Sequence, residues 1–226
     1  MSEKVAKKWL LSPEQRSDIV ARHPPIPWIY WLDLLASSDP AWALFFISYR
    51  LPFGSPQYVV TTVIDMFVFL RVGYFMHELA HRSERELPGF SLVWNLLVGI
   101  PILLPSMMMM AHMDHHRTCA YGTEQDPEYA PIAAWTRTLM VQSVLGFGMV
   151  PLLLPIRFAL LAPISFLHPT MRSHLVRKFS TVDINAGYNR PAPKGAELAA
   201  WRWQELACFT FSWAALIATG LGWLGI

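Results

Sequence analysis

The chain has 226 residues, of which 54% are apolar and only 15% are charged, with ten tryptophans and eleven methionines. Soluble domains carry about 25% charged residues, so this chain has too little polar surface to coat a water-facing globule of its size. The composition excludes a disordered protein and a nucleic-acid-coating protein, and it points to the membrane. The formal net charge is +2, and the two cysteines cannot form a disulfide framework.

Residues 1–26 predict an interfacial or cytoplasmic segment. They are basic and lack the apolar core of a signal peptide. Ser12 precedes Pro13 and is followed three residues later by Gln15, which is the pattern of a helix start with a capping box. We expect residues 1–226 to form a single membrane domain, in which residues 27–226 are the membrane part.

Five apolar stretches follow along the chain, at residues 41–52, 58–76, 92–111, 138–167 and 207–226. The first two stretches predict a spanning hairpin that is closed by a tight turn at residues 53–56. The aromatic-rich residues 27–35 lengthen the first of these spans. The third and fourth contain prolines that interrupt a straight helix, so we expect re-entrant or interfacial segments there. The fifth predicts a third span.

The basic residues suggest how these stretches lie in the membrane. They gather in residues 1–24, 82–85, 117–137 and 168–206, whereas only Arg50 lies at the other end of the first hairpin. Basic segments next to spans remain in the cytoplasm. The sequence therefore predicts an all-α integral membrane protein in which transmembrane helices and interfacial or re-entrant helices carry a cytoplasmic histidine cluster.

Five of the eight histidines lie in two short groups, a first histidine box at residues 77–81 (HELAH) and a second at residues 112–116 (HMDHH). Side chains three or four positions apart share one face of a helix, so each box presents its imidazoles together. Both boxes follow an apolar segment, and the predicted topology places them on the same side of the membrane. Converging imidazoles are typical of a transition-metal site.

The first box alone also fits a zinc protease, in which His77 and His81 bind zinc and Glu78 acts as general base. That interpretation gives no role to the three histidines of the second box. More imidazoles than one metal can use suggest two metals, and iron is the usual choice for oxygen chemistry.

Taken together, the two boxes resemble those of the membrane fatty acid desaturase family, including its hydroxylase and sphingolipid-desaturase relatives. The intervening WNLLVGIPILLP at residues 94–105 and the trailing HHRTCAYGTEQDPEY at residues 115–129 strengthen the resemblance. It covers roughly residues 40–226, and the segment at 190–205 is similar to bacterial members.

The resemblance implies an oxygen-dependent enzyme that desaturates a lipid acyl chain with two non-haem iron ions and O2. It implies an electron donor, such as a ferredoxin or a cytochrome-b5-like protein, and a place in the bacterial inner membrane. The ligands it implies are His77, His81, His112, His115 and His116. The carboxylates it suggests for orienting these imidazoles are Glu78, Asp114 and Asp126.

The sequence departs from the family pattern in one respect. The family has a third HxxHH box, and no such motif follows residue 116; His168 and His174 are the only later histidines. We therefore expect the chain to be C-terminally incomplete and inactive by itself. The alternatives are a lipid or carotenoid hydroxylase or ketolase on the same scaffold, a membrane zinc metalloprotease using HELAH, and an inactive truncated relative.

Overall fold

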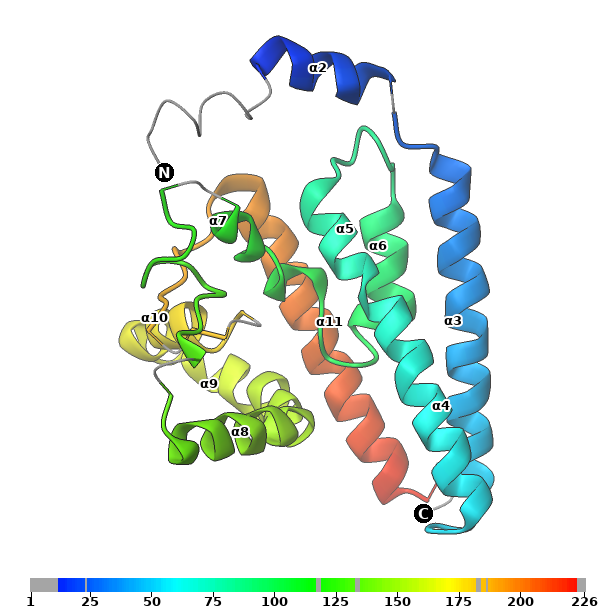
Figure 1. Ribbon diagram of the computed structural model, residues 1–226. Helices are drawn as coiled ribbons and strands as arrows, with labels where there is room; N and C mark the ends of the chain where they lie inside the picture. Colours follow the sequence, from blue (N-terminus) through cyan, green and yellow to red (C-terminus); the bar gives the residue numbers. More distant parts are fainter. Residues whose placement is uncertain are drawn as a thin grey trace.

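The computed structural model describes residues 12–22, 24–116, 119–132, 135–181, 184–185 and 187–222. The described residues form helices and connecting turns, with no strand among them (Figure 1). The predicted all-α fold is therefore confirmed. Parts of two predicted segments, residues 1–11 of the N-terminal segment and residues 223–226 of the third span, lie outside the described residues.

Most of these elements are α-helical, but η1 and η4 are π-helical and η2 is a 3-10 turn. In chain order they are α2 (Pro13–Arg22), α3 (Pro27–Arg50), α4 (Pro56–Gly73), α5 (Phe75–His81), α6 (Phe90–Trp94), η1 (Asn95–Gly99), η2 (Ser106–Met108), α7 (His112–His115), α8 (Arg137–Ile156), η4 (Arg157–Leu161), α9 (Ala162–Ser165), α10 (Pro169–Lys178) and α11 (Gly195–Gly220).

Helices α3 and α4 form the predicted hairpin and lie side by side (Figure 1). The turn between them contains Gly54 at a positive φ of 76°, a conformation that glycine adopts without steric cost. Ser55 then caps α4, because its side chain accepts a hydrogen bond from the backbone N–H of Tyr58 at 3.1 Å. Pro56 occupies the first turn, where its missing N–H costs nothing.

Two helical segments of the described chain, Pro56–His81 and Gly148–Ser165, are long and apolar enough to cross a membrane. Large apolar side chains on these segments point outward: Phe67 is 69% exposed and Leu152 is 60% exposed. A core helix of a soluble protein would bury such side chains. The second segment lies within residues 138–167, for which the sequence predicted a re-entrant or interfacial course.

The segment between the two histidine boxes is bent, as its prolines predicted. Helix α6 continues into η1 and ends at Gly99, where a Cβ atom would lie 2.7 Å from the Trp94 ring. The chain then reverses through Leu103, which has a positive φ of 59°. It then runs through η2 back up to α7, so the second box returns toward the first (Figure 1).

Two hydrophobic clusters hold these elements. One joins α3 to α6 and includes Leu34, Phe90 and Trp94, each fully buried. The other packs the reversal and η2 against η4, α10 and α11, with Phe158 and Trp201 at its centre. The first box therefore rests on one cluster and the segment before the second box on the other.

Candidate metal centre

Helix α5 presents the first histidine box. Phe75, Met76 and Ala80 are buried on one face of this helix, which fixes its rotation about its axis. His77 and His81 consequently lie together on the other face, with their ring centroids 4.6 Å apart. The four-residue spacing in the sequence thus becomes a pair of neighbouring imidazoles, as predicted.

A buried clamp of polar side chains positions the second box. Asn95 is fully buried, and its amide donates to Ser106 Oγ at 2.8 Å while its carbonyl accepts from the Ser106 backbone N–H at 2.8 Å. The next backbone N–H, of Met107, donates to Gln204 Oε1 on α11 at 2.8 Å. These bonds join η1, η2 and α11, and α7 follows four residues after η2.

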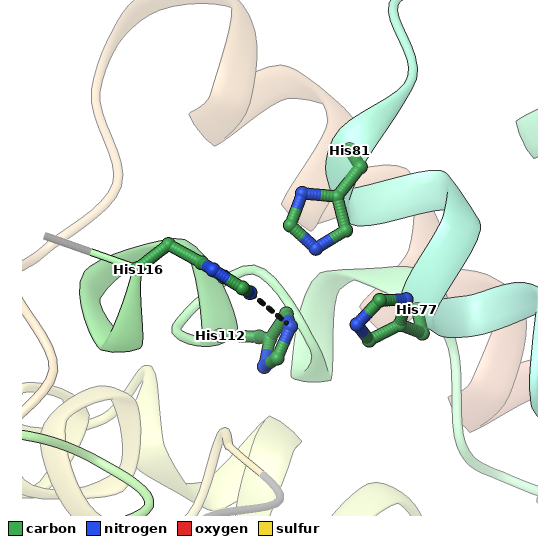
Figure 2. Close-up of side chains that lie close together, drawn as sticks. All are labelled: His77, His81, His112 and His116. Carbon is green, nitrogen blue, oxygen red and sulfur yellow. Dashed lines mark hydrogen bonds between the residues drawn. The ribbon is translucent and has the colours of Figure 1, made fainter. Parts of the chain in front are cut away.

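The two boxes meet in a group of four imidazoles, His77, His81, His112 and His116 (Figure 2). One ligand atom from each lies within 4.8 Å of all the others. Across the boxes, the ring centroids of His77 and His112 are 4.7 Å apart, and those of His81 and His116 are 4.5 Å apart. Within the second box, the Nε2 atoms of His112 and His116 lie 2.9 Å apart and share a hydrogen bond.

Two carboxylates on the loop after α7 hold imidazoles of the second box. Glu128 contacts Nδ1 of His112, and Asp126 Oδ1 lies 2.8 Å from Nδ1 of His115. An ionised carboxylate accepts a hydrogen bond from Nδ1–H, which keeps the proton on Nδ1 and leaves the Nε2 lone pair of the same ring available to a metal. Asp126 is among the carboxylates singled out in the sequence. Glu128 was missed, although it stands in the quoted QDPEY segment.

His115 lies outside the group of four. Its Nε2 atom is 3.6 Å from Glu128 Oε2, and its ring lies at a 48° tilt to that of Tyr121, with the centroids 5.0 Å apart. It remains adjacent to the group, because its centroid is 5.4 Å from that of His116. The structure therefore brings together four of the five predicted ligands, and the ligand role of His115 stays a prediction.

Glu78 and Asp114 have partners of a different kind. Glu78 Oε2 accepts from the Tyr30 hydroxyl at 3.4 Å and lies 3.6 Å from Arg82 Nε. Asp114 Oδ2 accepts from the Tyr188 hydroxyl at 2.7 Å. Their roles in orienting imidazoles stay predictions.

The electrostatics of the second box favour neutral imidazole beside ionised carboxylate. Loss of hydration, followed by the neighbouring rings of His112, His115 and His77, lowers the pKa of His116. Burial alone raises the pKa of Asp126, but backbone N–H groups of Gly122 and Glu128 and the bond from His115 outweigh it, so this pKa is lowered. Metals bind imidazole in its neutral form.

The donor set fits a transition metal. Imidazole nitrogen suits iron, zinc, copper and nickel, whereas magnesium and calcium require oxygen ligands. Metal–nitrogen bonds of about 2.1 Å place opposite ligands about 4.2 Å apart. One ligand atom from each of the four rings lies within 4.8 Å of all the others, which is close to this spacing.

Comparison with known proteins agrees with this geometry. Residues 53–226 match the family model described as fatty acid desaturase. A ceramide hydroxylase of Caulobacter vibrioides is 37% identical over 204 residues, which cover 86% of this chain and 55% of the relative. The chain thus spans about half the length of the curated relative it matches. No solved structure matches it.

Proposed function

This chain belongs to the fatty acid desaturase family, and on that premise we propose that it serves the O2-dependent oxidation of a lipid acyl chain. The observation that carries the proposal is the group of four imidazoles contributed by both histidine boxes, at the end of an apolar helix of membrane-spanning length. Such a position gives the group access to a lipid substrate within the bilayer.

We propose iron as the metal, held by His77, His81, His112 and His116, with His115 contributing to a second iron. When bound, iron supplies the activation of O2 that attack on an unactivated C–H bond requires. The protein residues hold and orient the imidazoles. Glu128 and Asp126 keep protons on Nδ1 of His112 and His115 and thereby direct the Nε2 atoms of these rings toward the metal. The proposed electron donor is a ferredoxin or a cytochrome-b5-like protein.

Desaturation is the first candidate outcome, and hydroxylation is the second. Desaturation removes two hydrogens from neighbouring carbons, whereas hydroxylation places one oxygen atom of O2 into a C–H bond; both take two electrons from a donor. The similarity to a protein named ceramide hydroxylase favours the second outcome. The relative is bacterial, which supports the bacterial inner membrane as the location, with the histidine boxes on its cytoplasmic face.

Metal analysis tests the proposal. The chain, purified in neutral detergent after growth with iron and zinc, is expected to carry iron, and His112→Ala with His116→Ala is expected to lose it. His174→Ala is the matched control, because His174 lies on α10 away from the boxes and packs on Phe179. One zinc per chain and no iron would overturn the proposal in favour of the protease.

Lipid analysis of the expressing cells separates the two outcomes. A new double bond or a new hydroxyl in an acyl chain identifies the reaction. We propose that residues 1–226 alone do not catalyse it, because the family resemblance implies ligands beyond those of the two boxes. Product formation by this chain alone would show that the two boxes suffice.

A further inference from the structure

A surface hollow lies between α10, residues 189–193 and the N-terminal part of α11. Its volume of about 660 Å³ falls within the roughly 300–1,000 Å³ typical of ligand sites. The lining includes exposed residues such as Pro169 and Asn189, so a ligand can enter from outside. No histidine of the two boxes lines the hollow, which is therefore separate from the metal centre.

The buried side chain of Arg190 holds the walls of this hollow together. Arg190 is 3% exposed, and its Nη1 donates to the Ser180 carbonyl at 2.9 Å. Its Nη2 donates to Glu197 Oε1 on α11 at 3.0 Å, and its backbone N–H donates to the Arg177 carbonyl on α10 at 3.1 Å. Residues 189–193 are thus tied to both helices, and the hollow is a fixed feature of the fold.

Three further arginines, Arg172, Arg177 and Arg202, line this hollow, and no acidic residue of the described chain does. Arg172 Nη2 is paired with Glu205 Oε2 at 2.7 Å. Arg177 and Arg202 are exposed, and among the described residues their guanidinium groups have no hydrogen-bond or ion-pair partner. A hollow lined by charges of one sign concentrates the potential of that sign, so this basic hollow attracts an anion.

A second hollow, of about 320 Å³, adjoins the basic hollow and shares Phe166 and Arg202 with it. Glu205 lines it, but its two oxygens are paired with Arg157 and Arg172. The other lining residues are apolar: Ala162, Pro163, Leu206 and Phe209. We call it the apolar hollow.

The two hollows follow each other along α11. This helix runs from the end of the molecule that carries α5 and α7 toward the turn between α3 and α4 (Figure 1). Leu206 and Phe209 come after Arg202 on α11, so the apolar hollow lies nearer that turn than the basic hollow does. A positive site thus lies at the box end and an apolar site along the direction of the spanning helix α4, which is how a membrane phospholipid arranges its head and its chains.

We propose that the two hollows together bind one phospholipid with an anionic head group. Its phosphate accepts hydrogen bonds from Arg177 and Arg202, and one acyl chain lies against Leu206 and Phe209. Guanidinium groups pair with phosphate through parallel N–H bonds, and basic residues at a membrane surface attract anionic lipids. The proposal does not depend on the metal centre or on the proposed reaction.

Native mass spectrometry of the full chain in neutral detergent tests the proposal. The probes are dioleoyl phosphatidylglycerol, dioleoyl phosphatidylcholine and glycerol 3-phosphate. They carry an anionic head with two chains, a zwitterionic head with the same chains, and a phosphate without chains. One saturable site is expected for phosphatidylglycerol, with phosphatidylcholine binding at least about tenfold more weakly and glycerol 3-phosphate more weakly still.

Three outcomes of this measurement would overturn the proposal. Equal binding of the two lipids would show that the arginines do not select an anion. Glycerol 3-phosphate that binds as tightly as phosphatidylglycerol would assign the basic hollow to a soluble phosphate. The third outcome is the absence of a saturable site for phosphatidylglycerol.

Variants that remove charge locate the head group. Arg177→Gln with Arg202→Gln is expected to weaken phosphatidylglycerol binding at least about tenfold, because both proposed phosphate donors are lost. Arg50→Gln with Arg85→Gln is the matched control, because it removes the same charge at exposed positions that line neither hollow. An equal loss in the two double variants would mean that net charge alone attracts the lipid, and would contradict the site.

A variant that fills the apolar hollow locates the acyl chain. Leu206→Trp is expected to weaken phosphatidylglycerol binding about tenfold, because the larger ring displaces methylene groups from the hollow. Leu216→Trp, elsewhere on α11, is expected to leave binding unchanged. Both leucines are exposed, so neither change disturbs the core. Unchanged binding in Leu206→Trp, or the same loss in both variants, would refute the placement of the chain.

A variant of the metal centre separates this proposal from the reaction. His116→Ala is expected to bind phosphatidylglycerol as the unaltered chain does. Loss of lipid binding in that variant would place the lipid at the metal centre and overturn an independent site.

Discussion

Asp126 Oδ1 lies 2.8 Å from Nδ1 of His115, and the Asp126 side chain is only 2% exposed. Backbone N–H groups of Gly122 and Glu128 donate to the same carboxylate, each at 2.8 Å. Asp126 therefore ties the loop after α7 to the second histidine box. Because the loop and the imidazoles are linked in this way, a change in the Asp126 carboxylate is expected to alter metal affinity.

Asp126→Asn is expected to lower the affinity for the iron to which His115 is proposed to contribute about 10- to 100-fold, the range seen when a carboxylate that orients a ligating imidazole is removed. The amide also cannot accept from His115 and the backbone as a carboxylate does. Iron titration followed by absorbance measures the effect. Glu124→Gln on the same loop is the control, because its side chain is exposed. Equal affinities for Asp126→Asn and the unaltered chain would show that the carboxylate does not support the metal.

His115 and His116 are neighbours in sequence but differ in position. His116 belongs to the group of four, whereas His115 lies toward Asp126 and Glu128. We therefore expect His116→Ala to remove the iron held by the group, and His115→Ala to retain at least that ion. Elemental analysis of the two purified variants checks this. Complete metal loss in both would mean that His115 is indispensable to the first ion as well.

Asn95→Leu removes the centre of the clamp that joins η1 to η2. The change leaves the buried Ser106 N–H without a partner, which costs about 1–3 kcal/mol. It also removes one of the two partners of the Ser106 hydroxyl, which keeps its bond to Gln204 Oε1 at 3.3 Å. We expect the free energy of unfolding to fall by about 3 kcal/mol, and the melting temperature in detergent to fall with it. Asn189→Leu is the matched control at an exposed position. A similar melting temperature for both variants would rule out the clamp as a stabilising element.

Glu205 is expected to make the stability of the fold depend on acidity. Burial raises its pKa, but the hydrogen bond from Arg172 and the charge of Arg157 outweigh burial, so the pKa lies below its ordinary value of 4.5. At pH values between the folded pKa of Glu205 and 4.5, the Glu205 carboxylate therefore binds a proton more readily in the unfolded chain than in the folded one. The stabilisation is present above about pH 4.5 and disappears as the pH falls through the folded pKa.

Melting curves of the unaltered chain and of Glu205→Gln, recorded from pH 7 downward, check this expectation. The variant is expected to melt lower at pH 7, because Arg157 loses its charged partner. The difference between the two proteins should narrow as the pH falls below 4.5. A constant difference across that range would contradict the assignment.

Most of the features that the sequence predicted correctly are local ones. The hairpin follows from apolar length and turn residues, and the pairing of His77 with His81 follows from helical periodicity alone. The bend between the boxes follows from Pro101 and Pro105. That the two boxes meet was predicted from topology, and the structure places four of their imidazoles together.

The features that were missed depend on contacts between distant positions. Glu128 reaches His112 only because the loop after α7 folds back, and no periodicity signals such a return. Gln204 accepts from Met107 across 97 positions. Arg157 stands in an apolar run that gives no hint of its partners, since Glu205 lies 48 positions away.

The hydrogen bond between the Nε2 atoms of His112 and His116 has a consequence for metal loading. One proton lies between the two nitrogens, and with Glu128 on Nδ1 of His112, it is His116 that donates it. The lone pair that accepts this proton is the same one that a cation would use. The proton and a metal ion therefore compete for the Nε2 lone pair of His112. His116 must carry its proton on Nδ1 before the Nε2 atoms of both rings can bind one ion.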